Sequence, residues 1–205
     1  RLAVIDPPRS HQPMVSADGQ TAIAFNGALY NFRELRRQLE DTGVVFQTDG
    51  DTEVLLQHFC KYGPEMFGRF TGMAAVAIYD GHNQSLLLLR DAVGQKPLHY
   101  AFTPDRIIFA SEAKALLAHP EVNGDLRRIS ITSYLTTGYI PYPESIYSDI
   151  LKLNPGHSLY VADKPSRPKM YWKPSWISLP ADKAGRVELT RQKLRRSVSQ
   201  RLVSD

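Results

Sequence analysis

Residues 73–90 read MAAVAIYDGHNQSLLLLR, two apolar runs separated by a short polar segment. The runs 73–79 and 86–90 have the length of buried strands. The polar segment 80–83 between them begins with Asp-Gly, which is a turn signal. Adjacent strands joined by so short a turn pair in antiparallel fashion, so this stretch predicts an antiparallel hairpin.

Further apolar runs follow along the chain. Residues 98–102 and 106–110 predict a second hairpin. We expect a short helix over 111–118 and one more strand over 157–162. Hairpins with interspersed helices are typical of a layered α+β domain with a largely antiparallel sheet.

The sequence pattern before the first hairpin predicts a strand followed by a helix. Residues 21–26, TAIAFN, predict a strand that ends in a turn at Asn26-Gly27. A helix is expected after Asn31, which is a candidate N-cap, and Gly43 is its stop signal.

A second helix is predicted over 52–62, with Asp51 as a plausible N-cap and Gly63 as its end. Cys60 lies inside this helix and is the single cysteine of the chain. We expect a buried core thiol there rather than a catalytic nucleophile. With one cysteine, no internal disulfide can form, and a reducing, cytoplasmic location is the simpler interpretation.

The composition is that of an ordinary globular protein. The chain has 205 residues, 42% of them hydrophobic, with 25 Lys and Arg against 21 Asp and Glu. Its apolar runs are strand-sized, far below the ~18 residues of a membrane span, and no signal peptide is recognisable, so we expect no membrane contact. The net charge of +4 resides in the terminal segment 182–205 rather than along a binding face. We therefore expect no nucleic-acid partner.

We divide the chain into three parts. Residues 1–163 form the predicted domain, and 164–186 form a Pro-rich linker. Residues 187–205 predict an amphipathic helix whose apolar stripe is Val187, Leu194, Val198 and Leu202. This helix follows a linker, and the chain begins without Met. We therefore expect a fragment whose last helix is the first element of a second domain.

Three elements could carry chemistry. Arg1 leads a probable strand, and Asp51 stands at the start of a helix, where it is either a cap or a ligand. The Asn26 side chain and the Gly27 backbone N–H can together direct two donors at one oxyanion. The alternative for Asn26-Gly27 is a plain turn. We expect no metal site.

Together these elements resemble a known family. The segments RLAVID (1–6), FNGALYNF (25–32), QTDGDTEVLL (47–56), FASEAKALL (109–117) and LNPGHSLYV (153–161) occur in this order. In that order they closely resemble the glutaminase domain of glutamine-hydrolysing asparagine synthetases. The similarity is collinear over nearly the whole chain and is therefore specific.

The resemblance implies an N-terminal-nucleophile fold, an αββα sandwich of largely antiparallel sheets. In that family an N-terminal Cys thiolate attacks the glutamine carboxamide, and its own α-amino group serves as base. The ammonia released then reaches a synthetase domain, which amidates aspartate with ATP. The resemblance thus implies glutamine and a C-terminal synthetase domain of the same chain as partners, with ATP and Mg²⁺ used by that domain and no cofactor in residues 1–205. A homodimer is a further partner that the sequence allows.

The resemblance also assigns individual residues. Asn26 and Gly27 match the oxyanion hole, Arg1 matches the residue that holds the glutamine α-carboxylate, and Asp51 matches the carboxylate that receives the substrate ammonium. The whole glutamine-binding set is Arg1, Leu2, Ala3, Val4, Ile5, Asn26, Gly27, Ala28 and Asp51.

Two departures from the family pattern matter. The nucleophilic Cys belongs to a segment that precedes the position of Arg1, so we expect the chain as given not to hydrolyse glutamine. The family pattern Asn-Gly-Glu reads Asn26-Gly27-Ala28 here, and the methyl of Ala28 cannot hold an ammonium. The sequence is therefore compatible with two functions. One is the glutaminase part of an asparagine synthetase, and the other is a non-catalytic scaffold of a synthetase that uses free ammonia or forms another amide.

Overall fold

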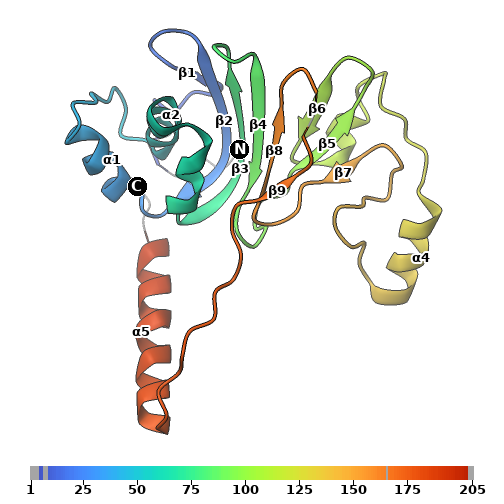
Figure 1. The fold of residues 1–205 in the computed structure, drawn as a ribbon. Helices are drawn as coiled ribbons and strands as arrows, with labels where there is room; N and C mark the ends of the chain where they lie inside the picture. The colour runs from blue at the N-terminus through green and yellow to red at the C-terminus, as the bar shows by residue number, and fades with distance from the viewer. Residues whose placement is uncertain (1–4, 7–8, 165, 203–205) are drawn as a thin grey trace.

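The computed structural model describes residues 5–6, 9–164 and 166–202. Its strands form a six-stranded sheet of order β1-β2-β3-β4-β8-β9 and a three-stranded sheet of order β6-β5-β7 (Figure 1). The strands are β1 (Met14–Val15), β2 (Thr21–Leu29), β3 (Gly72–Asp80), β4 (Ser85–Arg90), β5 (His99–Phe102), β6 (Ile107–Ala110), β7 (Leu151–Lys152), β8 (His157–Val161) and β9 (Lys169–Met170). The helices are α1 (Phe32–Glu40), α2 (Asp51–Tyr62), the 3₁₀ helix η1 (Gly63–Arg69), α3 (Ala113–Leu116), α4 (Arg128–Thr137) and α5 (Lys183–Arg201).

The hairpin over residues 73–90 is confirmed, because β3 and β4 pair antiparallel with Ile78 opposite Leu87. The predicted second hairpin is confirmed as the antiparallel pair of β5 and β6. In β3 and β4, successive side chains point to opposite faces of the six-stranded sheet. Both faces of these central strands are therefore available for burial, which explains their almost continuous apolar sequence.

One face of the six-stranded sheet is covered by helices. Phe25 of β2 and Val76 of β3 belong to a buried cluster with Leu35 of α1, Leu55 of α2 and Phe67 of η1. Each of these side chains is almost fully removed from water. Burial of one large aliphatic or aromatic side chain stabilises the fold by ~1.5–3 kcal/mol, so this cluster holds α1 and α2 on the sheet.

The opposite face packs against the three-stranded sheet. Ala77 and Leu88 of the larger sheet share a buried cluster with Tyr100 of β5. On the outer side of the smaller sheet, Ala101 packs with Leu116 of α3. The layers are therefore helices, sheet, sheet and a short helix, and the predicted αββα sandwich is confirmed.

The Asn26-Gly27 pair is a strand segment, and the predicted turn is wrong. Strand β2 continues through both residues to Leu29, with Asn26 opposite Ala75 and Gly27 opposite Ala74 of β3. A Cβ at position 27 would collide with the carbonyl of Met73, so the glycine permits a close backbone approach rather than a turn. The long partner β3 provides hydrogen bonds that outweigh the local turn preference.

Both predicted N-caps before the first two helices need correction. Asn31 precedes α1, but its side chain makes no cap hydrogen bond. Its Nδ2 donates to the Arg69 carbonyl (3.0 Å) and its Oδ1 accepts from Thr71 N–H (3.0 Å), which ties α1 to the start of β3. Helix α2 begins at Asp51 itself, and Gly50 is the N-cap residue.

The C-terminal segment divides differently from the expected linker and helix. Strand β9 pairs with β8, and the hydroxyl of Tyr171 donates to the Arg90 carbonyl (2.9 Å), so residues 169–171 pack with the sandwich. Helix α5 begins at Lys183, before the expected start at 187. Its N-cap is Asp182, whose side chain accepts from Gly185 N–H (2.7 Å).

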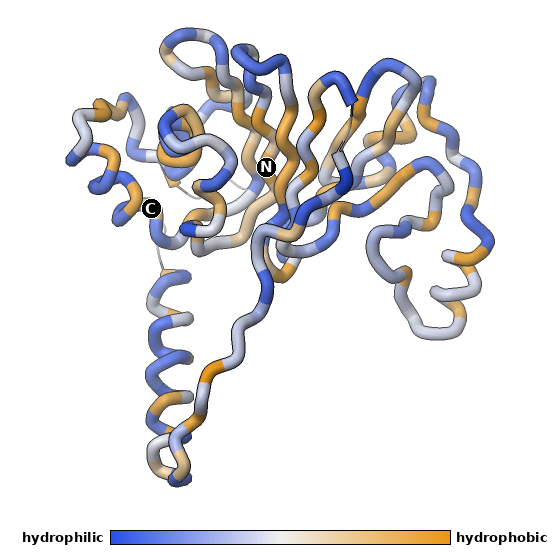
Figure 2. The backbone as a smooth tube through the Cα atoms, viewed as in Figure 1, coloured by the Kyte–Doolittle hydropathy of each residue, from blue (hydrophilic) through white to orange (hydrophobic). Residues whose placement is uncertain are grey.

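An irregular segment leads away from the sandwich, and helix α5 runs back toward it (Figure 1). At its last turn the Arg201 guanidinium lies over the Tyr30 ring, 5.1 Å from the ring centroid. Figure 2 shows hydrophobic residues concentrated along the central strands, whereas α5 is mostly hydrophilic. Among the residues that the structure describes, none of the helices has both the length and the apolarity needed to cross a membrane.

Candidate functional site

A cavity of about 220 Å³ opens between the two sheets beside Asn26. Asn26 and Ala75 line it from the six-stranded sheet, and Leu98, Phe109 and Ser111 line it from the chain of the smaller sheet. The Asn26 side chain is half-buried at this wall. The mostly apolar wall, with the amide as one of its few polar groups, resembles the usual composition of a small-molecule site.

The backbone N–H groups of β2 alternate between its two edges. Tyr30 N–H, just beyond the strand, donates to the Thr71 carbonyl (2.8 Å), so even-numbered residues of β2 face β3. Odd-numbered residues therefore donate to the other edge. There Phe25 N–H donates to Gln12 Oε1 (2.7 Å) and Leu29 N–H donates to Asp51 Oδ2 (2.9 Å).

The Gly27 N–H lies between the Phe25 and Leu29 N–H groups along the strand and points to the same edge. Its neighbour Asn26 carries a side-chain amide that reaches the cavity. The structure thus brings a backbone donor and an amide donor to consecutive positions of one strand, which is the arrangement an oxyanion hole needs. Their role as oxyanion donors stays a prediction.

Asp51 is brought to the same strand. Its side chain is buried, at 4% exposure, and its carboxylate binds the backbone of Leu29, two residues beyond Gly27. Asp51 lies in the first turn of α2, at the helix end where negative charge is stabilised. The interpretation of Asp51 as an N-cap is therefore wrong, and its role toward a substrate ammonium stays a prediction.

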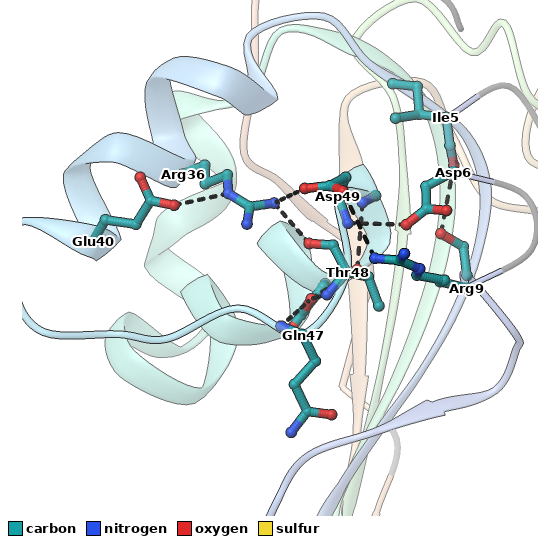
Figure 3. A network of polar contacts seen from close by, with 11 residues as sticks. Ile5, Asp6, Arg9, Arg36, Glu40, Gln47, Thr48 and Asp49 are labelled. Atoms are coloured by element: carbon teal, nitrogen blue, oxygen red, sulfur yellow. Dashed lines mark hydrogen bonds and ion pairs between the residues drawn. The ribbon is translucent and has the colours of Figure 1, made fainter.

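A network of polar contacts holds the loop that leads into Asp51 (Figure 3). Asp49 N–H donates to Asp6 Oδ2 (2.9 Å), and the Asp49 carboxylate lies 3.6 Å from Arg36 Nη1. The same Arg36 nitrogen donates to the Thr48 carbonyl (2.7 Å). The loop is thus tied to both α1 and the segment around Asp6.

Glu53 also fixes this loop, and sequence reasoning did not identify it. This carboxylate is buried and accepts hydrogen bonds from Gln47 N–H (2.9 Å), Thr48 N–H (2.6 Å) and the Thr48 hydroxyl (2.7 Å). Glu53 is the third residue of α2, the position from which a Glu side chain commonly reaches back to the preceding backbone. That spacing is the signal by which it could have been found.

The N-terminal part of the predicted site is described only at its end. Arg1, Leu2, Ala3 and Val4 lie outside the described residues. Ile5 is buried in the cluster between the helices and the sheet. A Cβ built on Gly50 would lie 3.7 Å from the Ile5 carbonyl, so Ile5 is beside the residue that precedes Asp51.

Ala28 is buried in β2 opposite Met73. Its methyl group offers no polar atom to a ligand. At the position where the family pattern has a glutamate, this chain therefore has the buried methyl group of Ala28, which packs inside the fold.

Gln12 and Thr52 join the site and were also missed. Gln12 lines the cavity, and its Nε2 donates to the Thr52 hydroxyl on α2 (3.4 Å). The preceding residue, His11, is exposed. Residues 11–14 read His-Gln-Pro-Met. A glutamine in such a segment gives no pattern that would reveal its partners before the fold is known.

Cys60 is not the buried core thiol that we expected. The residue is exposed on α2 beside Asp18 and Asp80. Desolvation of its sulfur, reinforced by these two carboxylates, raises the pKa of the thiol above its ordinary value. A thiol held in its protonated form is a poor nucleophile, which agrees with a non-catalytic Cys60.

Among the described residues, no group of three or more His, Cys, Asp or Glu side chains is placed to hold a metal ion.

Comparison with known families decides the assignment. A family model described as a glutamine amidotransferase domain matches residues 1–172. The chain belongs to this family. Within it, the chain is similar to part of proteins named as glutamine-hydrolysing asparagine synthetases.

The chain is similar to asparagine synthetase [glutamine-hydrolyzing] 1 of Bacillus subtilis, with 32% identity over the whole chain and 32% of that protein. It is also similar to putative asparagine synthetase [glutamine-hydrolyzing] 2 of Methanocaldococcus jannaschii, with 32% identity over the whole chain and 43% of that protein. The chain therefore spans less than half the length of these relatives.

Among solved structures, the chain is similar to glutamine phosphoribosylpyrophosphate amidotransferase from B. subtilis. The TM-score is 0.54 at 23% identity, over 78% of this chain and 32% of that one. This likeness supports the N-terminal-nucleophile sandwich described above and concerns the fold alone.

Proposed function

We propose that this amidotransferase domain binds L-glutamine at the outer edge of β2 and presents its carboxamide for hydrolysis. One observation supports the proposal above all. The edge places the Gly27 N–H between the Asn26 amide and the Leu29 N–H that holds the Asp51 carboxylate. A glutamine bound along this edge would have oxyanion donors at its carboxamide and a carboxylate for its ammonium.

The reaction proposed is an acyl transfer to a thiolate. The sulfur attacks the carboxamide carbon, the carbonyl oxygen becomes an oxyanion held by Asn26 and Gly27, and the C–N bond breaks to release ammonia. Water then cleaves the thioester and releases glutamate. The nucleophile and its amine base are assigned to a Cys that precedes Arg1, as the family resemblance implies. In the same proposal Arg1 pairs with the substrate α-carboxylate, for which a guanidinium is well shaped.

The fate of the ammonia is a proposal about a longer protein. We infer that a C-terminal synthetase domain of the same chain consumes it to amidate aspartate, and that ATP and Mg²⁺ are used there. The relatives named as glutamine-hydrolysing asparagine synthetases, of which this chain spans only part, support this inference.

The second candidate is a non-catalytic scaffold for a synthetase that uses free ammonia or forms another amide. The observation that favours it is Ala28, which is buried and brings no carboxylate to the substrate ammonium. If the domain is such a scaffold, it has no measurable affinity for L-glutamine.

Binding of L-glutamine to the 205-residue chain, measured by isothermal calorimetry, separates the two candidates. We expect binding to the wild type and a loss of about tenfold or more in affinity for Asp51→Asn, because a charge-assisted bond to the ammonium is lost. The amide can still accept from Leu29 N–H, so the fold should persist. Asp182→Asn, at the start of α5, is the matched control and should bind like the wild type.

The same samples test the nucleophile. We expect glutamate release at the buffer background from the wild-type chain and from Cys60→Ser alike. Glutamate formation that disappears in Cys60→Ser would refute the assignment of the nucleophile. Absence of glutamine binding would favour the scaffold.

A further inference from the structure

The outer edge of β2 is bound by side chains at several points where no strand accompanies it. Strand β1 pairs with β2 only at Ala22 and Ile23. Before this short pairing, Thr21 N–H donates to the Ser16 hydroxyl (2.9 Å). After it, Phe25 N–H donates to the carboxamide of Gln12.

Gln12 takes the place of the next backbone acceptor along this edge. It stands two residues before β1, and the intervening Pro13 has no N–H with which to continue a ladder. The Gln12 Oε1 bonds the residue directly before Asn26, at 2.7 Å. Its Nε2 donates to the hydroxyl of Thr52, the residue directly after Asp51, at 3.4 Å.

The two ends of one carboxamide therefore contact the neighbours of the two proposed substrate-binding groups. On one side is the strand that carries Asn26 and the Gly27 N–H, and on the other is the first turn of the helix that carries Asp51. Thr52 is buried and Gln12 is half-buried at the cavity wall. An amide in this position bridges β2 and α2 without adding a charge to the site.

We propose that Gln12 is a positioning residue that sets the separation between the oxyanion donors on β2 and the Asp51 carboxylate on α2. The inference rests on the proposed function, because both groups must engage one glutamine for their separation to matter. A glutamine has its carboxamide and its ammonium at opposite ends. The separation therefore decides whether the ammonium adds to the affinity.

The readout is discrimination between L-glutamine and glutaramate, which keeps the carboxamide and the carboxylate but lacks the ammonium. We expect Gln12→Met, similar in length but unable to form either bond, to reduce the ratio of the two affinities by about two- to tenfold. Affinity for glutaramate should change much less, because glutaramate does not use Asp51.

Two variants separate positioning from a general loss of structure. Thr52→Val removes only the far end of the bridge, so it should lower the same ratio, and its effect should be non-additive with Gln12→Met. Ser16→Ala removes another side-chain acceptor on the same edge of β2, remote from the site. It should change stability but leave the ratio unchanged.

Amide NMR on the ligand-free chain gives a second test that does not depend on substrate. We expect Gln12→Met to shift the Gly27 amide resonance and speed its hydrogen exchange, whereas Ser16→Ala leaves it unchanged. An unaltered Gly27 amide in Gln12→Met, or an affinity ratio that Ser16→Ala lowers equally, overturns the inference. If the wild type fails to bind glutamine, both the proposed function and the substrate role of Gln12 are refuted. If the wild type binds glutamine and Gln12→Met leaves the affinity ratio unchanged, only the positioning role of Gln12 is refuted.

Discussion

Helices α2 and α5 each have an aspartate at their start, but the two carboxylates bind different partners. Asp182 accepts from Gly185 N–H within its own helix. Asp51 accepts from Leu29 N–H on a strand that is 22 residues away in the sequence. The first serves local helix stability and the second joins two elements, although both positions follow the same sequence rule for helix starts.

The two helices also differ in what they bury. Eight residues of α2 are buried, with Leu55 exposed by only 1%. None of the residues of α5 is buried, and Leu194 of its apolar stripe is 61% exposed. An amphipathic pattern therefore indicates which face of a helix can be buried, but burial requires a surface that covers it. Three substitutions or pairs of substitutions test this contrast.

The largest expected effect is a core truncation in α2. Leu55→Ala should lower the free energy of unfolding by about 2–5 kcal/mol, because it removes buried methyl groups and leaves a cavity. Leu194→Ala in α5 should change it by less than about 0.5 kcal/mol, because the side chain is largely in water. Urea unfolding measures both, and equal losses would mean that α5 packs as tightly as α2.

Removal of the two aspartates should separate their roles. Asp51→Ala leaves the Leu29 N–H buried without its acceptor and should cost about 1–3 kcal/mol of global stability. Asp182→Ala should cost about 1 kcal/mol of α5 helix stability and leave the urea midpoint of the sandwich in place. Circular dichroism measures the helix content. Amide hydrogen exchange measures the stability of the sandwich. A lower midpoint for Asp182→Ala would contradict the separation.

The smallest effect concerns pH. His58 of α2 is fully buried, with Nε2 3.1 Å from the Leu35 carbonyl, and α5 has no histidine. Desolvation, with the charges of Arg69 and Lys61, lowers the pKa of His58 below its ordinary value of 6.5. The unfolded chain therefore binds the proton first.

Stability from a neutral His58 is accordingly complete above pH 6.5 and is lost as the pH falls toward the lower, folded-state pKa. The loss is at most about 1.4 kcal/mol per pH unit, the limit for one proton. We expect His58→Gln to flatten the stability profile between pH 7 and 5. His99, whose pKa is also lowered by burial, should account for part of the slope that remains. An unchanged slope would show that His58 is protonated equally well in both states.

Much of the fold follows from local sequence. The hairpin of β3 and β4 is encoded by two apolar runs and a short turn, and antiparallel pairing follows from the length of that turn. The buried stripe of α1, with Phe32, Leu35 and Leu39, follows from the helical repeat alone. These features depend on neighbours within a few residues, which a sequence displays directly.

The tertiary structure decided the partners of the polar groups. Asn26-Gly27 has the local signature of a turn, yet the ladder with β3 holds it extended. Asp51 has the signature of a cap, yet the edge of β2 offers it a backbone donor. Gln12 has no distinctive signature. In each case the outcome depends on hydrogen-bonding groups far away in the sequence, and buried polar groups must find such partners wherever the fold brings them.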